Sequence, residues 1–178
     1  KTREAEHVHG VEGGVASSLK HVQDRTLHVH GRGRAVAGRR HATEIQLRSP
    51  IGSHFRLQSE WPAPGEAQRA PSGLAYLSAG VGFCYMTQLS RYAHIAKLNV
   101  DSIRIVQHTA FAPSSDPAGG TAVALPVDTH AFIEADEPDS AVNNLVRMGE
   151  RTCFLHAAMR AACPSAVRAE LGGAPLEV

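Results

Sequence analysis

The sequence predicts an α+β domain in which antiparallel strands precede and separate two long helices. Three segments of alternating apolar and polar residues come first, followed by a long segment with helical periodicity, two more strands and a second helix. This order lacks the strict strand–helix alternation of a parallel sheet. The 178 residues, of which 43% are apolar and 20% charged, suit a single globular domain.

The first three strands are expected at residues 26–36, 43–49 and 54–60, because each segment alternates. The segment "SPIG" supplies a turn between the last two, so the three strands predict an antiparallel meander. Residues 1–25 are weakly patterned and are expected to form an N-terminal extension, with the domain itself spanning 26–178.

A long helix is expected at about residues 73–97, directly after a proline-rich loop. Gln88 interrupts its apolar stripe, so this amide needs a partner or a place at the edge of the buried face. Gly80 and Gly82 could let another backbone approach the helix closely. The residues of the stripe are Leu74, Leu77, Val81, Cys84, Tyr92 and Ile95.

The second half of the domain repeats the pattern of strands followed by a helix. Strands are expected at 100–112 and 121–136, with Pro126 marking an edge or a bulge in the second. A second long helix is expected at about 138–162, with Cys153 on its inward stripe. The tail "PSAVRAELGGAPLEV" predicts a last short helix.

Charge and hydropathy argue against several classes of partner. The formal net charge of +1 gives no electrostatic basis for binding nucleic acid or an acidic membrane surface. No apolar run approaches the roughly 20 residues that span a bilayer. The opening segment "KTREAEHVHG" lacks the apolar stretch of a signal peptide, so a cytoplasmic protein is expected.

The three cysteines, Cys84, Cys153 and Cys163, form no CxxC motif, which argues against a zinc ribbon or a thioredoxin-type site. Each cysteine taken alone is explained by burial as a small hydrophobe. Cys84 and Cys153, however, face inward from the two helices that should pack together. A thiolate that attacks a peroxide, with a second thiol that resolves the sulfenic acid, would use this arrangement.

Two segments carry a resemblance to a known family. They are "APSGLAYLSAGVGFCYM", a proline-led start of a helix around a cysteine, and "ERTCFLHAAM", a second cysteine followed by small and apolar residues. The cysteines are 153 − 84 = 69 residues apart. Together with the order of elements, residues 26–165 resemble the OsmC/Ohr family, bacterial thiol-dependent peroxidases that reduce organic hydroperoxides.

The resemblance implies an intertwined homodimer, in which antiparallel strands wrap around two long central helices. Cys84 would then be the peroxidatic cysteine and Cys153 the resolving one, with Cys163 a competing resolver because proline follows it. Arg32 or Arg34 would stabilise the reactive thiolate, with Arg39 and Arg40 as less favoured candidates, although a solvated turn explains all four equally well. Organic or fatty-acid hydroperoxides are the implied substrates. An external dithiol would be the reductant, with no metal or organic cofactor.

One departure from the family leaves a second function open. Many members carry a glutamate about three helical turns before the reactive cysteine, where it holds the arginine. Leu74 and Ala75 stand at the matching positions, and Glu66 in the preceding loop is the available substitute. The alternative is therefore a catalytically weak or inactive dimer of the same fold that binds an apolar small molecule.

Histidine pairs raise a third hypothesis, a metal-binding protein. The motif "HVH" occurs twice, and residues two apart in a strand face the same side. Such imidazole pairs could begin a zinc or copper site, although surface histidines explain them more simply. The residues concerned are His7, His9, His28 and His30, with Cys153 and His156 as further ligands on a helix.

Overall fold

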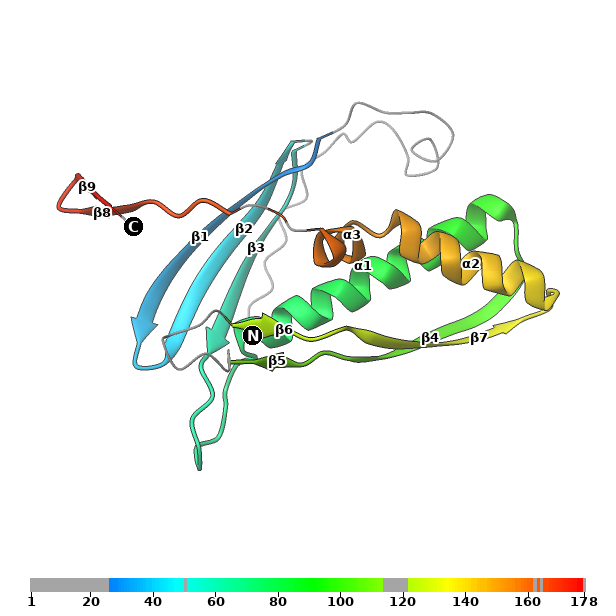
Figure 1. Ribbon diagram of the computed structural model, residues 1–178, viewed down its shortest axis with the longest axis horizontal. Helices are drawn as coiled ribbons and strands as arrows, with labels where there is room; N and C mark the ends of the chain where they lie inside the picture. The colour runs from blue at the N-terminus through cyan, green and yellow to red at the C-terminus, as the bar shows by residue number, and fades with distance from the viewer. Residues whose placement is uncertain (1–25, 50, 114–121, 162, 164, 178) are drawn as a thin grey trace.

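The computed structural model describes residues 26–49, 51–113, 122–161, 163 and 165–177, and the predicted extension at 1–25 lies outside them. A three-stranded sheet forms one part of the molecule, and three helices with the long strands β4 and β7 form the other (Figure 1). No helix that the described part of the chain contains is long and apolar enough to cross a membrane.

The predicted meander is confirmed as the antiparallel sheet β1–β2–β3. Its strands run His28–Ala37, Arg40–Ser49 and Ile51–Glu60. In its register Arg32 of β1 faces Glu44 of β2, which in turn faces Arg56 of β3. Neither face of this sheet is covered by a helix of the described chain (Figure 1).

The predicted long helix is confirmed as α1, Gly73–Ala96. Ser72 caps its start, because its hydroxyl accepts a hydrogen bond from the Ala75 N–H at 3.1 Å. Lys97 ends it in the left-handed conformation, with φ of 56°.

The predicted apolar stripe of α1 is only partly right. Val81, Tyr85, Leu89 and Ala93 are buried together with Gln88, whereas the predicted Leu74 and Leu77 are 46% and 41% exposed. The reason is that α2 packs against the later turns of α1, so its first two turns have no such neighbour (Figure 1).

Each of the two strands expected after α1 is broken into a long and a short piece. The long pieces, β4 (Val100–His108) and β7 (Asp128–Ala135), pair antiparallel, as do the short pieces β5 (Phe111–Ala112) and β6 (Val123–Ala124). Pro126 lies in the gap between β6 and β7, where a missing backbone N–H costs no ladder hydrogen bond.

The expectation of one helix over 138–162 is wrong, because the chain forms two helices that break at Cys153. Helix α2 spans Asp139–Thr152 and α3 spans Phe154–Arg160, while Cys153 between them is extended, with φ −79° and ψ 115°. The Thr152 hydroxyl donates to the Met148 carbonyl at 2.8 Å, a local bond of the kind that competes with helical hydrogen bonding.

The expectation of a helix in the C-terminal tail is also wrong. The tail forms a hairpin of β8 (Ala169–Leu171) and β9 (Ala174–Leu176). Gly172 and Gly173 have positive φ angles of 61° and 84°, which a two-residue hairpin turn requires and most residues resist.

The hydrophobic core lies between α1 and α2, and the cysteines belong to it. Leu89 and Leu145 are fully buried at its centre. A Cβ on Gly149 of α2 would lie 2.6 Å from Leu89 Cδ2, so only glycine permits this approach of the two helices. Among the described residues no backbone approaches Gly80 or Gly82 closely, since a Cβ there would meet only side chains, at ordinary distances of 3.5 Å or more.

Candidate functional site: a cysteine pair and an arginine-lined cavity

Cys84 and Cys153 meet at the edge of the core. Cys84 lies in the middle of α1 and is half-buried, whereas Cys153 is 1% exposed at the junction of α2 and α3. Cys84 packs against the buried cluster that includes Cys153, and both thiols are free. The break in the second helix therefore lies where a second sulfur packs against the face of α1 that carries Cys84.

The electrostatic environment distinguishes Cys153 as a protonated thiol at neutral pH. Burial raises the pKa of Cys153, and the neighbouring Cys84 raises it further by hydrogen bonding and by charge. The backbone N–H groups of His156 and Leu155 lower the pKa, because they stabilise the thiolate. Interaction with the Cys84 side chain indicates that the two sulfurs lie within reach of each other.

A buried polar contact joins the two helices beside this pair. The Gln88 side-chain oxygen accepts hydrogen bonds from Arg91 Nη1 at 3.1 Å and from Thr152 Oγ1 at 3.5 Å. Gln88 follows Cys84 by one helical turn, and Thr152 directly precedes Cys153. The amide that interrupts the apolar stripe thus has its partner, and it ties α1 to the end of α2 next to both cysteines.

The two cysteines have aromatic neighbours in the sequence, one buried and two exposed. Tyr85 is 4% exposed, donates to the Val146 carbonyl at 3.3 Å and packs its ring against His156. Phe83 and Phe154, each next to a cysteine in the sequence, are 73% and 63% exposed. Large exposed apolar side chains at both cysteines offer a contact surface for an apolar molecule or a second protein chain.

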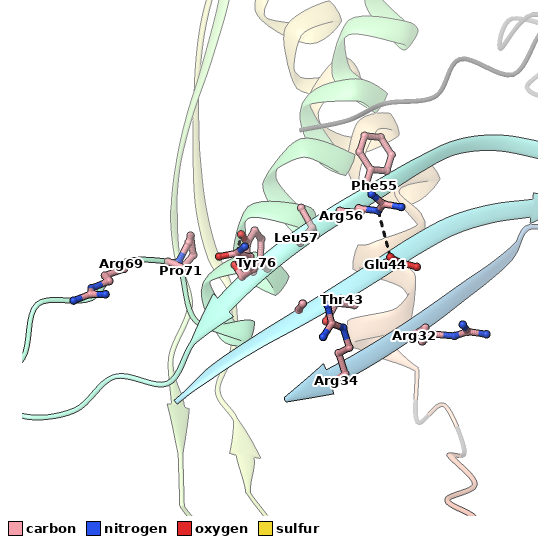
Figure 2. A pocket seen from close by; sticks show the side chains of 13 residues that line it. Arg32, Arg34, Thr43, Glu44, Phe55, Arg56, Leu57, Arg69, Pro71 and Tyr76 are labelled. Atoms are coloured by element: carbon pink, nitrogen blue, oxygen red, sulfur yellow. Dashed lines mark hydrogen bonds and ion pairs between the residues drawn. The ribbon is translucent and has the colours of Figure 1, made fainter. Parts of the chain in front are cut away.

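Arg32 and Arg34 lie on exposed strand β1 and line a cavity of about 890 Å³ between the sheet and the start of α1. Figure 2 shows both side chains together with Glu44 and Arg56, whose ion pair measures 3.3 Å. Apolar groups make up much of the cavity wall, and neither Cys84 nor Cys153 lines it. The apolar members are Ala42, Phe55, Leu57, Ala70 and Pro71.

A different arginine, Arg39, is the one held by carboxylates. Arg39 pairs with Glu66 at 2.5 Å and with Glu60 at 3.6 Å, and it donates to the Trp61 carbonyl at 3.1 Å. Glu66 therefore does hold an arginine, but not Arg32 or Arg34. Glu60 also accepts from the Arg69 N–H at 2.7 Å, and this bond lowers the pKa of its carboxyl.

The sequence pattern did not predict this cluster of Arg39, Glu60 and Glu66. The available signal was Glu60 at the end of an alternating strand, opposite Arg40 and next to Arg39 across the meander. The cluster fastens both ends of the loop that leads into α1. The cluster therefore holds the loop before α1 in position. It includes neither Cys84 nor Cys153.

The remaining predicted residues lie apart from the pair. Cys163 is exposed, and Leu74 stands in the first turn of α1 with no carboxylate at its position or at Ala75. His28 and His30 lie on β1, and His7 and His9 fall outside the described residues. Within the described ranges, no group of three or more His, Cys, Asp or Glu side chains could hold a metal ion.

Comparisons with known proteins agree with this architecture. Residues 65–168 match the family described as OsmC-like protein. No curated protein sequence matches the chain. The matched region contains α1, α2 and both cysteines of the pair.

Solved structures share the fold at low identity. An OsmC-like hydroperoxide resistance protein from Jannaschia sp. CCS1 is 19% identical, with 84% of this chain and 96% of that chain covered and a TM-score of 0.55. An OsmC-like protein from Mycoplasma pneumoniae is 12% identical, with 79% of this chain and 91% of that chain covered and a TM-score of 0.58. An organic hydroperoxide resistance protein from Elizabethkingia anophelis is 14% identical, with 80% of this chain and 93% of that chain covered and a TM-score of 0.57. The predicted mixed fold with antiparallel sheets is thereby confirmed.

Proposed function

Because the chain belongs to the OsmC-like protein family, we propose that it is a thiol-dependent peroxidase that reduces organic hydroperoxides through Cys84 and Cys153. The observation that carries this proposal is the pair of free thiols in mutual contact, one half-buried and one buried. Solved proteins of the same fold are named for organic hydroperoxide resistance, which supports the same chemistry.

The cycle has two thiol steps. The Cys84 thiolate attacks an oxygen of the hydroperoxide, the O–O bond breaks, and the alkoxide leaves as the alcohol after taking up a proton. Cys84 is then a sulfenic acid. The Cys153 sulfur attacks the sulfenic sulfur, the S–O bond breaks, and a disulfide and water form. An external dithiol returns both cysteines to thiols, so the cycle needs no metal or organic cofactor.

The difference in exposure between the two cysteines supports the proposed roles. Cys84 is the more accessible thiol, so it meets the substrate first. Cys153 is buried and its pKa is raised, which suits a thiol that acts only after a sulfenic acid has formed beside it. The exposed rings of Phe83 and Phe154 favour apolar hydroperoxides, including those of fatty acids, over hydrogen peroxide.

The proposal includes an intertwined homodimer that works in the cytoplasm. No helix of the described residues covers the sheet β1–β2–β3, and a second copy would supply a covering layer. Arg32 and Arg34 line a cavity that excludes the cysteines of their own chain. We therefore assign them to the thiolate of the second copy, where a guanidinium would favour the charged sulfur.

Intact mass after one equivalent of cumene hydroperoxide tests the cysteine roles. The wild type is expected to lose two hydrogens as a disulfide forms, and Cys153→Ser to gain one oxygen and stop there. Cys84→Ser is expected to remain unchanged. Cys163→Ser is the matched control and should behave as wild type, because that thiol is exposed and is not part of the hydrophobic core. A wild type whose thiols stay reduced would contradict the proposal.

Mixed dimers test the arginine assignment. Cys84→Ser and the double variant Arg32→Ala/Arg34→Ala are each expected to be inactive or weak. A mixture of the two would regain activity if each arginine serves the other chain, because one site then carries neither lesion. A mixture as inactive as its parts would contradict the assignment.

The cavity supports a second candidate function, the binding of an apolar small molecule without turnover. Its volume of about 890 Å³ and its walls of Phe55, Leu57 and Pro71 fall within the range of small-molecule sites. An apolar fluorescent naphthylamine should then bind to wild type and lose affinity in Phe55→Ala. Phe132→Ala on β7 is the control, since Phe132 is exposed away from the cavity. Equal affinity for all three proteins would rule out this function.

A further inference from the structure

His156 lies beside the cysteine pair, and neither thiol step of the cycle uses it. It is the third residue of α3, the helix that begins directly after Cys153. A side chain at the third position of a helix is placed to reach back over the residue that caps the helix, as it does in a capping box. The backbone N–H groups of His156 and Leu155 lower the pKa of Cys153, so the first turn of α3 lies close to this thiol.

Tyr85 fixes the imidazole from the opposite side. The two rings lie 5.0 Å apart between centroids and are tilted by 56°. Tyr85 directly follows Cys84 in α1. Burial raises the pKa of Tyr85, and negative charges on Glu150 and Cys153 raise it further, so the phenol ring lies close to the resolving sulfur. The imidazole thus lies between α1 and α3, three residues after Cys153 and against the tyrosine that directly follows Cys84.

One nitrogen of His156 is available for proton transfer. Its Nδ1 is buried and has no hydrogen-bond partner among the described residues. Burial lowers the pKa of His156, while the charged groups that face it act in opposite directions, Glu150 raising the pKa and Arg160 lowering it. At neutral pH the imidazole is therefore an uncharged base.

The resolving step requires such a base. Burial and Cys84 keep Cys153 protonated at neutral pH, yet only a thiolate attacks a sulfenic sulfur efficiently. The hydroxide that leaves Cys84 also needs a proton. One group that accepts the first proton and donates it again would serve both needs.

We propose that the imidazole of His156 carries the proton of the resolving step, from the Cys153 sulfur to the hydroxide that leaves Cys84. The Cys153 sulfur forms the S–S bond as the imidazole takes its proton. The S–O bond of the sulfenic acid then breaks, and the imidazolium returns the proton to give water. The inference rests on the proposed peroxidase cycle and adds a residue to its second step.

Separate time courses of the two steps test this role. Wild type, His156→Gln and His156→Phe receive one equivalent of cumene hydroperoxide, and acid-quenched samples are weighed intact for sulfenic acid and disulfide. His156→Phe keeps a ring against Tyr85 but has no nitrogen, so packing and proton transfer are separated. The backbone N–H that faces Cys153 remains in every variant.

Both variants are expected to form the sulfenic acid at the wild-type rate and to close the disulfide about 100-fold more slowly, the usual scale of general acid–base catalysis. Wild-type closure should slow at acid pH, with a midpoint below the ordinary imidazole pKa of about 6.5, because burial lowers the pKa of His156. In the variants this acid limb should vanish, and closure should rise with pH as Cys153 ionises. His94→Gln, an exposed histidine near the end of α1, should match wild type in rate and in pH profile.

The outcomes distinguish the inference from the cycle. Normal sulfenic acid formation with unchanged closure and pH profile in both variants would overturn the role of His156 alone. A wild type that forms neither sulfenic acid nor disulfide would overturn the cycle and, with it, the inference. Slow closure in His156→Gln with normal closure in His156→Phe would also overturn it, since phenylalanine carries no proton.

Discussion

The sheet β1–β2–β3 and the helical part of the molecule are equally regular but bury very different amounts of side chain. All ten residues of β1 are exposed, and Glu60 is the one buried side chain of the described sheet. Every buried apolar residue of the described chain belongs instead to α1, α2 or their junction with α3. The helical part therefore has its own hydrophobic core, whereas the described sheet is held by the backbone hydrogen bonds between its strands.

Truncating a buried leucine and an exposed sheet valine gives the largest contrast. Leu89→Ala is expected to lower the free energy of unfolding by about 2–5 kcal/mol, because Leu89 is fully buried between two helices. Val29→Ala on β1, where Val29 is 66% exposed, should change it by less than about 0.5 kcal/mol in dilute protein. Urea unfolding measures both values.

Repeating the Val29→Ala measurement at high protein concentration sharpens the comparison. If a second copy covers the sheet, the loss should grow with concentration, because association stabilises the folded state by mass action. A loss that stays small at every concentration would mean that no copy of the chain covers this part of β1.

Two glycine substitutions test the same contrast at the backbone. Gly149→Ala should destabilise by about 1–3 kcal/mol, because the new Cβ would overlap Leu89 Cδ2 and press on Tyr85. Gly31→Ala on β1 meets no atom within 4 Å and should be nearly neutral. Thermal unfolding of the two variants beside wild type measures the difference. Equal effects would show that the sheet is as tightly packed as the helices.

Periodicity predicted most of the fold, because backbone hydrogen bonding and burial of one face act over many residues. The meander, α1 and the antiparallel strand pair follow from such patterns. The break at Cys153 does not, because the helical pattern of the sequence continues through this position, where the backbone is extended. The tail was mistaken for a helix because the Gly172–Gly173 turn was not recognised.

The candidate site was predictable only where it depends on helix faces. Cys84 and Cys153 could be paired from the sequence because the helical pattern turns both toward the core, where both lie although Cys153 falls at a helix break. The pairing of Arg39 with Glu60 and Glu66 could not, because it depends on how a proline-rich loop folds back on a strand end. His156 was visible only as a possible metal ligand, since its contact with Tyr85 is set by tertiary packing.

The capping residue of α1 links the two parts of the molecule and should have a moderate effect. Ser72→Ala removes the hydroxyl that accepts from the Ala75 N–H and should cost about 1 kcal/mol of stability. Ser90→Ala, at an exposed position inside the same helix, is the control and should be neutral or slightly stabilising. Chemical denaturation of both variants tests this, and equal results would mean that the cap contributes nothing.

Glu60 should give the smallest effect and the most local one, because it is a polar anchor at the end of an otherwise exposed sheet. Its pKa is lowered by the Arg69 N–H, against an opposing effect of burial, and by Arg39. A carboxyl with a lowered folded-state pKa stabilises the protein above its unfolded value of 4.5 and loses that contribution as the pH falls through the folded value.

Glu60→Gln should therefore be less stable than wild type at pH 7, with the gap closing below pH 4.5. Hydrogen exchange should locate this loss in the amides of β2 and β3, which Glu60 and Arg39 join to the loop before α1. Glu66→Gln, whose side chain is 65% exposed, should show a weaker trend. If Glu60→Gln instead loosened α1 and α2 as much as the sheet, the two parts would unfold as one unit and the contrast in burial would not separate their stabilities.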